Sequence, residues 1–236
     1  MKLDILAFGA HPDDVELSCG GTIIKYIKEG KRVGIVDLTR GELGTQGNET
    51  IRDSESSVSQ SILGVEKRIN LDIGDGWFEI NKENKLKVVR AIRRYKPTII
   101  LANAQDDRHP DHPRAAQLLK ESLFLSGLKK IETIDNGVVQ DIWRPKYLFH
   151  YIQYRYIKPD FVVDVSSHFE TKMKAIMSFK SQFYEPGKES ETLISSKKYL
   201  DFIRGRSHEM GSSIQVEHGE GFTTVVPLQI DLKNLL

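Results

Sequence analysis

The sequence predicts an α/β fold with a doubly wound, mostly parallel sheet, and two observations support this prediction. Short, nearly continuous apolar runs alternate four times with segments of helical apolar spacing over the first 126 residues. Such runs are typical of strands that are covered on both faces. Strand alternating with helix implies right-handed crossovers, which place helices on both sides of the sheet.

Residues that start or stop helices set the expected boundaries. Gly30 closes the first helix, Pro97 stops the third, and Pro113 opens the fourth at its first turn. We expect strands at 3–9, 33–36, 68–73 and 98–102, a loop at 39–49, and helices at 15–29, 51–63, 86–95 and from 113 onward.

The pattern is weaker after about residue 126. Apolar runs predict strands at 147–152 and 161–165, helices at 169–179 and 194–206, and an edge strand at 222–226 that Pro227 ends. We find no repeat or linker, so we expect one domain over 1–236, with a core at 1–126 and a C-terminal α/β elaboration at 127–236.

Composition excludes several classes of protein. Of 236 residues 39% are hydrophobic, and 34 Lys and Arg face 33 Asp and Glu, a net charge of +1. This balance gives no reason to expect nucleic acid or a membrane as partner. The single cysteine, Cys19, excludes an internal disulfide. Without a signal peptide or an apolar run of ~18–20 residues, we expect a cytoplasmic protein.

Polar residues collect where the predicted strands end. His11, Asp13 and Asp14 follow the first strand, and the segment 106–112 follows the fourth. Ligands of open parallel sheets bind at the carboxyl ends of the strands, so both histidine loops should reach one edge. The glycine fingerprint of a dinucleotide site is missing, which disfavours a nicotinamide oxidoreductase.

These side chains suit a metal site. His11, Asp14 and His112 would supply two imidazoles and one carboxylate with an open fourth position, a common catalytic zinc shell that also accepts iron(II) or cobalt. Asp13 diverges from its neighbour Asp14 and could act as general base on a metal-activated water. This set describes hydrolysis of an amide or ester.

Four further residues complete the candidate site. His109 could stabilise the oxyanion or protonate a leaving amine, and Asp111 could hold its second nitrogen. Arg52 and Arg108 offer forks for a carboxylate or phosphate. A surface salt bridge is an equally good interpretation of either arginine.

Structural interpretations compete elsewhere too. Asp13 or Asp14 alone commonly caps a helix, but capping explains neither the three histidines nor their arrival at one edge. The pair at 20–21, Gly-Gly, fits close packing as well as substrate access, and Cys19 fits a small core residue. His218, at the start of the glycine-containing segment His218-Gly219-Glu220-Gly221, could line a pocket.

Two motifs resemble the LmbE-like (PIG-L) zinc N-deacetylases: His11-Pro12-Asp13-Asp14-Val15-Glu16 with Gly20-Gly21, and Arg108-His109-Pro110-Asp111-His112. The likeness extends through 39–44 and Arg52 to 218–222. It implies a Rossmann-like fold and hydrolysis of N-acetylglucosamine conjugates, and it is greatest for members of bacillithiol biosynthesis, which deacetylate N-acetylglucosaminyl malate.

The resemblance also implies roles for these residues. His11, Asp14 and His112 become zinc ligands, Asp13 the general base, and His109 the oxyanion and leaving-group partner oriented by Asp111. Arg52 and Arg108 would face the malate carboxylates. Asp107 stands where some relatives carry a tyrosine. Family members commonly form trimers or hexamers, so a homo-oligomer is expected.

Alternatives remain open. The same chemistry would serve a chitooligosaccharide or another cysteinyl-sugar conjugate. A protein of another class, a metal-dependent sugar-binding module without turnover, would use the same ligands.

Overall fold

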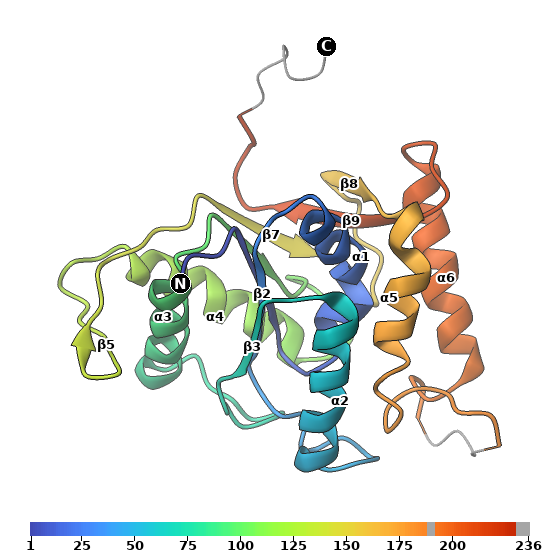
Figure 1. The fold of residues 1–236 in the computed structure, drawn as a ribbon, viewed down its shortest axis with the longest axis horizontal. Helices are drawn as coiled ribbons and strands as arrows, with labels where there is room; N and C mark the ends of the chain where they lie inside the picture. The colour runs from blue at the N-terminus through green and yellow to red at the C-terminus, as the bar shows by residue number, and fades with distance from the viewer. Residues whose placement is uncertain (188–191, 230–236) are drawn as a thin grey trace.

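A seven-stranded sheet, ordered β3-β2-β1-β4-β7-β9-β8, forms the centre of the computed structural model (Figure 1), which describes residues 1–187 and 192–229. Its strands are β1 (Ile5–Gly9), β2 (Val33–Asp37), β3 (Lys67–Asn70), β4 (Ile99–Ala102), β7 (Tyr147–Tyr151), β8 (Phe161–Asp164) and β9 (Gly219–Thr224). The helices are α1 (Asp14–Lys28), α2 (Glu49–Leu63), α3 (Lys82–Tyr95), α4 (Asp111–Ser126), α5 (Phe169–Ile176) and α6 (Lys197–Ser212).

The first half confirms the predicted doubly wound arrangement. β1 pairs in parallel with β2 on one side and with β4 on the other. Helices α1 and α2 pack together on one face of the sheet, and α3 and α4 on the opposite face (Figure 1). Side chains of β1 alternate to match: Leu6 and Phe8 join the core beneath α3 and α4, whereas Ile5 and Ala7 join the core beneath α1.

Three strands from the C-terminal part join the same sheet. β7 is parallel to β4, but β9 is antiparallel to both of its neighbours, β7 and β8. The prediction of an edge strand at 222–226 is therefore wrong, because β9 is interior and begins at Gly219. A Cβ at Gly219 would lie 2.8 Å from the Gly211 nitrogen, and one at Gly221 would lie 2.9 Å from Met210 Sδ. These glycines let α6 pack directly on the strand.

Several predicted boundaries also shift. β3 ends at Asn70, before Asp72 adopts a positive φ of 52°. α6 begins late, after Ser196 caps it by accepting from the Tyr199 N–H. The predicted helix at 169–179 is shorter, and a hairpin of β5 (Ile134–Asp135) and β6 (Val138–Val139) was not predicted.

Helix α1 has a break that bears on the site. Cys19 has non-helical angles (φ −141°, ψ 18°), so the first turn, 14–18, is separated from the rest of the helix. Asp13, just before that turn, has φ 117°, a conformation that is rare and costly for any residue but glycine. Cys19 is fully buried, which confirms the prediction of a core residue.

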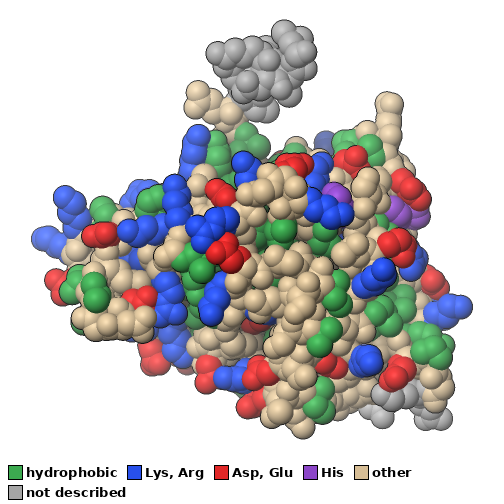
Figure 2. Space-filling view, viewed as in Figure 1, with side chains coloured by type: hydrophobic (Ala, Val, Ile, Leu, Met, Phe, Trp, Pro, Cys, Tyr) green, Lys and Arg blue, Asp and Glu red, His purple; other side chains and the backbone are tan. Residues whose placement is uncertain are grey.

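The surface carries charges of both signs. Figure 2 shows Lys and Arg side chains interspersed with Asp and Glu over this face, in keeping with the net charge of +1. Among the described residues, no helix has the length and apolar character needed to cross a bilayer.

Candidate active site

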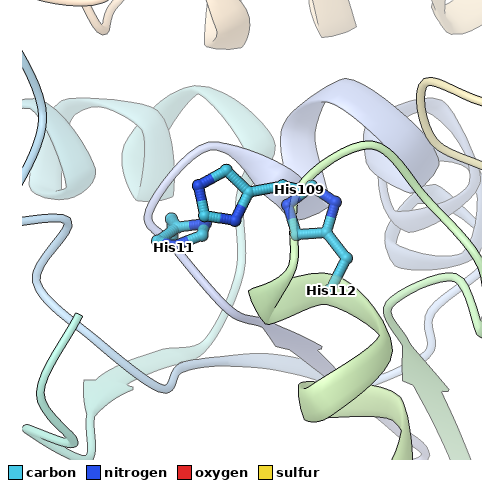
Figure 3. A group of neighbouring side chains, drawn as sticks. All are labelled: His11, His109 and His112. Atoms are coloured by element: carbon cyan, nitrogen blue, oxygen red, sulfur yellow. The ribbon is translucent and has the colours of Figure 1, made fainter. Parts of the chain in front are cut away.

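The two histidine loops meet at the carboxyl ends of β1 and β4. Figure 3 shows the rings of His11, His109 and His112 grouped together, although almost a hundred residues separate the first from the others. Ring centroids lie 4.6 Å apart for His11 and His109, 5.2 Å for His109 and His112, and 5.7 Å for His11 and His112. One nitrogen from each ring lies within 4.8 Å of the others, so this group could hold a metal ion.

Asp14 lies between two of these histidines. Its Oδ1 is 3.1 Å from His112 Nε2, and its Oδ2 is 3.6 Å from His11 Nδ1. Asn103 and Gln153 each donate a hydrogen bond to this carboxylate. Burial alone would raise the pKa of the Asp14 carboxyl, but the charges and hydrogen bonds of the two histidines hold it well below its ordinary value. The structure thus brings the three predicted ligands together.

In His11 and in His112, the ring nitrogen that points away from Asp14 contacts another carboxylate. His112 Nδ1 lies 2.5 Å from Asp107 Oδ2, and His11 Nε2 lies 3.0 Å from Asp75 Oδ1 and 3.4 Å from Asp111 Oδ2. Carboxylates in these positions keep the far nitrogens protonated, as the outer partners of metal-bound histidines do. The lone pairs of His11 Nδ1 and His112 Nε2 are then both left on the side of Asp14.

Without a metal, protons compete for these nitrogens. Burial would lower the pKa of both imidazoles, but the carboxylates overcome it. The hydrogen bonds that His11 donates to the carboxylates of Asp111, Asp14 and Asp75 raise the pKa of His11 well above its usual value. The Asp14 charge and the Asp107 hydrogen bond raise the pKa of His112 to about 9.

The prediction that the Asp111 carboxylate holds the His109 ring is wrong. That group instead contacts His11, and it also accepts hydrogen bonds from the Gly76 N–H and from Arg114. Only the backbone N–H of Asp111 reaches His109, donating to Nδ1 at 3.3 Å. The carboxylate turns away because the first turn of α4 places it over His11.

His109 is a neutral donor in this arrangement. Burial and the charges of His11 and His112 lower the pKa of His109. Since Nδ1 accepts the Asp111 N–H, the proton of the neutral ring resides on Nε2. His109 therefore presents an N–H, rather than a lone pair, through its other nitrogen.

Asp13 and Arg52 form a buried pair behind the three predicted ligands. Burial raises the pKa of the Asp13 carboxyl to about 7, although the Arg52 charge acts in the opposite direction. Arg52 Nη2 lies 3.3 Å from Asp13 Oδ2 and donates to the Pro12 carbonyl at 2.5 Å. Arg52, predicted to bind substrate, lines the cavity, but it is only 3% exposed and its Nη2 is used within the protein.

A single aromatic ring supports this pair from the C-terminal part. The guanidinium carbon of Arg52 lies 5.7 Å from the centroid of Phe179, and that of Arg68 lies 5.8 Å from the same centroid. Arg68 in turn pairs with Glu16 at 2.5 Å and with Asp37 at 2.7 Å. Glu16 of the first motif is therefore structural.

A cavity of about 380 Å³ opens over the site. His11, Asp13, Asp14, His109 and His112 line it, and so do Arg52 and Arg108. Arg108 is exposed, with its guanidinium carbon 5.2 Å from the ring centroid of Tyr154. His218 is not among the residues that line this cavity, and its ring instead stacks on Phe169 with centroids 3.7 Å apart.

Four further side chains contact the predicted ligands, although sequence reasoning gave none of them a role in the site: Asp75, Asp107, Asn103 and Gln153. Asp75 and Asn103 follow strands three and four, so their position at the carboxyl edge could have indicated that they belong to the site. Gln153 follows β7, in the part whose strand order the sequence did not predict.

Fold and site together define a class: an α/β enzyme with a histidine and aspartate cluster able to hold a metal ion at the carboxyl edge of its sheet. The family model PIG-L, described as GlcNAc-PI de-N-acetylase, matches residues 6–123, half of the chain and both histidine loops. This chain belongs to the PIG-L family of deacetylases.

Relatives of known name agree with this assignment. Diacetylchitobiose deacetylase of Thermococcus kodakarensis is 32% identical over 191 residues, 77% of this chain and 70% of that protein. A Bacillus anthracis protein named "Probable N-acetyl-alpha-D-glucosaminyl L-malate deacetylase 2" is 26% identical over 132 residues, 50% of this chain and 58% of that protein.

Solved structures share the whole fold. A conserved protein of Thermus thermophilus is 32% identical, with a TM-score of 0.87 over 97% of both chains. The N,N'-diacetylchitobiose deacetylase of Pyrococcus horikoshii is 27% identical, with a TM-score of 0.79 over 93% of this chain and 82% of that one.

Proposed function

We propose that this chain is a zinc-dependent hydrolase that removes the N-acetyl group from an N-acetylglucosamine conjugate. The observation that carries the proposal is the orientation of two imidazoles. Asp75 and Asp111 occupy one nitrogen of His11, and Asp107 occupies one nitrogen of His112, so that both free lone pairs face Asp14.

The residues present fit a zinc ion. His11, Asp14 and His112 would hold it, with two nitrogens and one carboxylate in the proportions of a catalytic zinc shell. The same donors accept iron(II), so the physiological metal is a separate question. When bound, the ion supplies Lewis acidity toward water and the amide carbonyl. His109 is left out of the shell because its free nitrogen carries a proton.

Two side chains would assist the reaction. Asp13 lines the cavity beside the ligands, and a carboxyl with a pKa of about 7 can accept a proton from the attacking water near neutral pH. The Nε2–H of His109 would donate a hydrogen bond to the carbonyl oxygen as it gains charge, and Asp13 would then pass the proton taken from water to the departing amine. Asp14, as ligand, would keep its charge throughout.

The aglycone is proposed to be malate, on the strength of Arg108. Its guanidinium stands at the cavity over Tyr154, where a bidentate carboxylate could reach it. Arg52 adds less to this choice, since its Nη2 is held by Asp13 and the Pro12 carbonyl. A second candidate, diacetylchitobiose or another chitooligosaccharide, is favoured by the relative that matches the larger share of the chain.

An acetate-release assay tests the proposal. Purified protein, stripped with chelator and reloaded with zinc, iron(II) or cobalt, would be given N-acetylglucosaminyl malate, diacetylchitobiose and N-acetylglucosamine. We expect activity that chelation abolishes and metal restores, with the malate conjugate preferred. Brisk turnover of chitobiose without turnover of the malate conjugate would refute the narrower proposal, and tight sugar binding without acetate release would favour a binding module.

The proposal extends to the location, assembly and domain organisation of the protein. We propose a cytoplasmic homo-oligomer, a trimer or hexamer, built from one domain with its core at 1–126. Sedimentation of the purified chain tests the assembly, since a monomer at micromolar concentration would contradict it.

A further inference from the structure

Glu220 lies where β9, α1 and α5 meet, and together with Lys172 it forms part of the cavity wall. Its Oε1 accepts the Gly21 N–H at 2.9 Å, and its Oε2 accepts the Thr22 N–H at 2.7 Å. Lys172 of α5 donates to Oε1 at 2.7 Å. Glu220 and Lys172 are each only 3% exposed. A carboxylate 198 residues further along the chain thus binds two backbone groups in the middle of α1.

The break at Cys19 explains why α1 needs this carboxylate. A regular helix would direct the N–H groups of Gly21 and Thr22 to carbonyls four residues earlier, but the ladder is interrupted there. The second segment of α1 therefore has its own N-terminus, where a negative charge is favourable. Lys172 balances the buried charge, which would be costly alone.

Gly21 is fitted to this contact. A Cβ at this position would lie 3.1 Å from Glu220 Oε1 and 2.7 Å from Val165 Cβ, so no larger residue fits without displacing the carboxylate. This resolves the two interpretations of the Gly-Gly pair in favour of close packing at its second glycine. The C-terminal motif at 218–221 and the first motif are therefore two sides of one contact.

We propose that Glu220, held by Lys172, is a positioning residue for the deacetylation proposed above. By fixing the break in α1, it sets the direction of the first turn, 14–18, and so aims Asp13 and Asp14 at the cavity. Both Glu220 oxygens are already used by protein donors, so it acts through α1 rather than on the substrate. Metal ligands tolerate errors of only about 0.2 Å, which makes the turn sensitive to its support.

Glu220→Gln tests the proposal, because the amide keeps the size of the side chain but can accept at only one of the two N–H groups. We expect kcat to fall about 10- to 100-fold, as for small misplacements of reacting groups, with KM little changed. Metal affinity should weaken about tenfold, as for loss of outer support, and the visible spectrum of the cobalt-loaded protein should shift.

Val88→Ala serves as the matched control. Val88 is fully buried in α3, on the opposite face of the sheet from α1, so its truncation lowers stability without touching this contact. If Glu220→Gln loses as much thermal stability as Val88→Ala but keeps wild-type kcat, metal affinity and cobalt spectrum, the pair is merely structural and the proposal is overturned.

Lys172→Met is the second variant, since it keeps the length of the stem and removes only the charge. It should show the same changes as Glu220→Gln in weaker form. If neither variant folds, the pair belongs to folding and the proposal also fails. If the wild-type chain releases no acetate, the proposed function fails instead, while metal affinity and the cobalt spectrum still compare the variants.

Discussion

The two halves of the chain contribute different things to one site. Loops after β1 and β4, in the first half, supply every proposed metal ligand and proton-transfer group. The C-terminal part supplies walls and supports: Tyr154 beneath Arg108, Gln153 on Asp14, and Glu220 on α1. The comparison teaches that the doubly wound core fixes the chemistry, whereas the elaboration shapes what reaches it and holds it in place.

The sharpest test of the first half is Asp13→Asn. We expect kcat to fall about 10²- to 10⁴-fold, because the general base is lost, while metal content stays at the wild-type level. Acetate release and metal analysis on the same preparation would measure both. Asp53→Asn is the control, because that carboxylate is exposed and pairs with Arg40 away from the ligands. Unchanged turnover in Asp13→Asn would contradict the assignment of the base.

Asp107→Asn should weaken metal binding without removing a ligand. Losing the carboxylate on His112 Nδ1 should cost about 10- to 100-fold in metal affinity. Competition with a chromophoric chelator measures this. Asp106→Asn changes the adjacent, exposed carboxylate, which pairs with Arg155, and should leave the affinity alone. Equal effects in both variants would show that local charge, and not the hydrogen bond, matters.

Metal affinity should also depend on pH. With a pKa of about 9 in the metal-free protein, His112 is protonated at neutral pH, so a metal ion must displace that proton. Affinity should therefore weaken as pH falls, by about tenfold per unit for each proton displaced, and the contribution of His112 should level off above pH 9. Chelator competition between pH 6 and pH 9 gives the slope; a flat profile would mean that the imidazoles are already neutral.

The smallest effect is expected in the C-terminal wall. Tyr154→Ala removes the ring beneath Arg108, and a contact of this kind is worth about 0.5–1 kcal/mol, a two- to fivefold rise in KM for an acidic aglycone. Steady-state kinetics on the malate conjugate would measure it, with kcat unchanged. Tyr156→Ala is the control, since Tyr156 is exposed and contacts Arg206 instead. A fall in kcat would mean that this wall also serves the chemistry.

Sequence reasoning succeeded where one local rule decides the outcome. The buried strands β1, β2 and β4 are nearly continuous apolar runs, and the rule that ligands gather at carboxyl ends brought His11, Asp14 and His112 together correctly. It failed where a contact between distant segments decides. The predicted strand began only at residue 222 and so left out Gly219 and Gly221, although both lie inside β9, where α6 packs closely on them.

One of the other errors could have been avoided from the local sequence, whereas two could not. The hairpin β5–β6 turns at Asn136 and Gly137, whose positive φ values are typical of an Asn-Gly turn that the sequence already displayed. The carboxylate of Asp111 lies over His11 instead of His109, which depends on the direction of the first turn of α4 and cannot be read from spacing. The contact of Arg52 with Asp13 likewise appears only once α2 is placed.

Phe179, in the C-terminal part, contacts the charged groups of the first half directly. One ring, just beyond α5, lies against both the cation beside Asp13 and the cation that ties Glu16 to Asp37. Phe179 is not among the residues that line the cavity, so a change of this ring can alter the pKa of Asp13 through Arg52 without changing the cavity wall. Relatives that differ at this ring should accordingly differ in their pH optima as well.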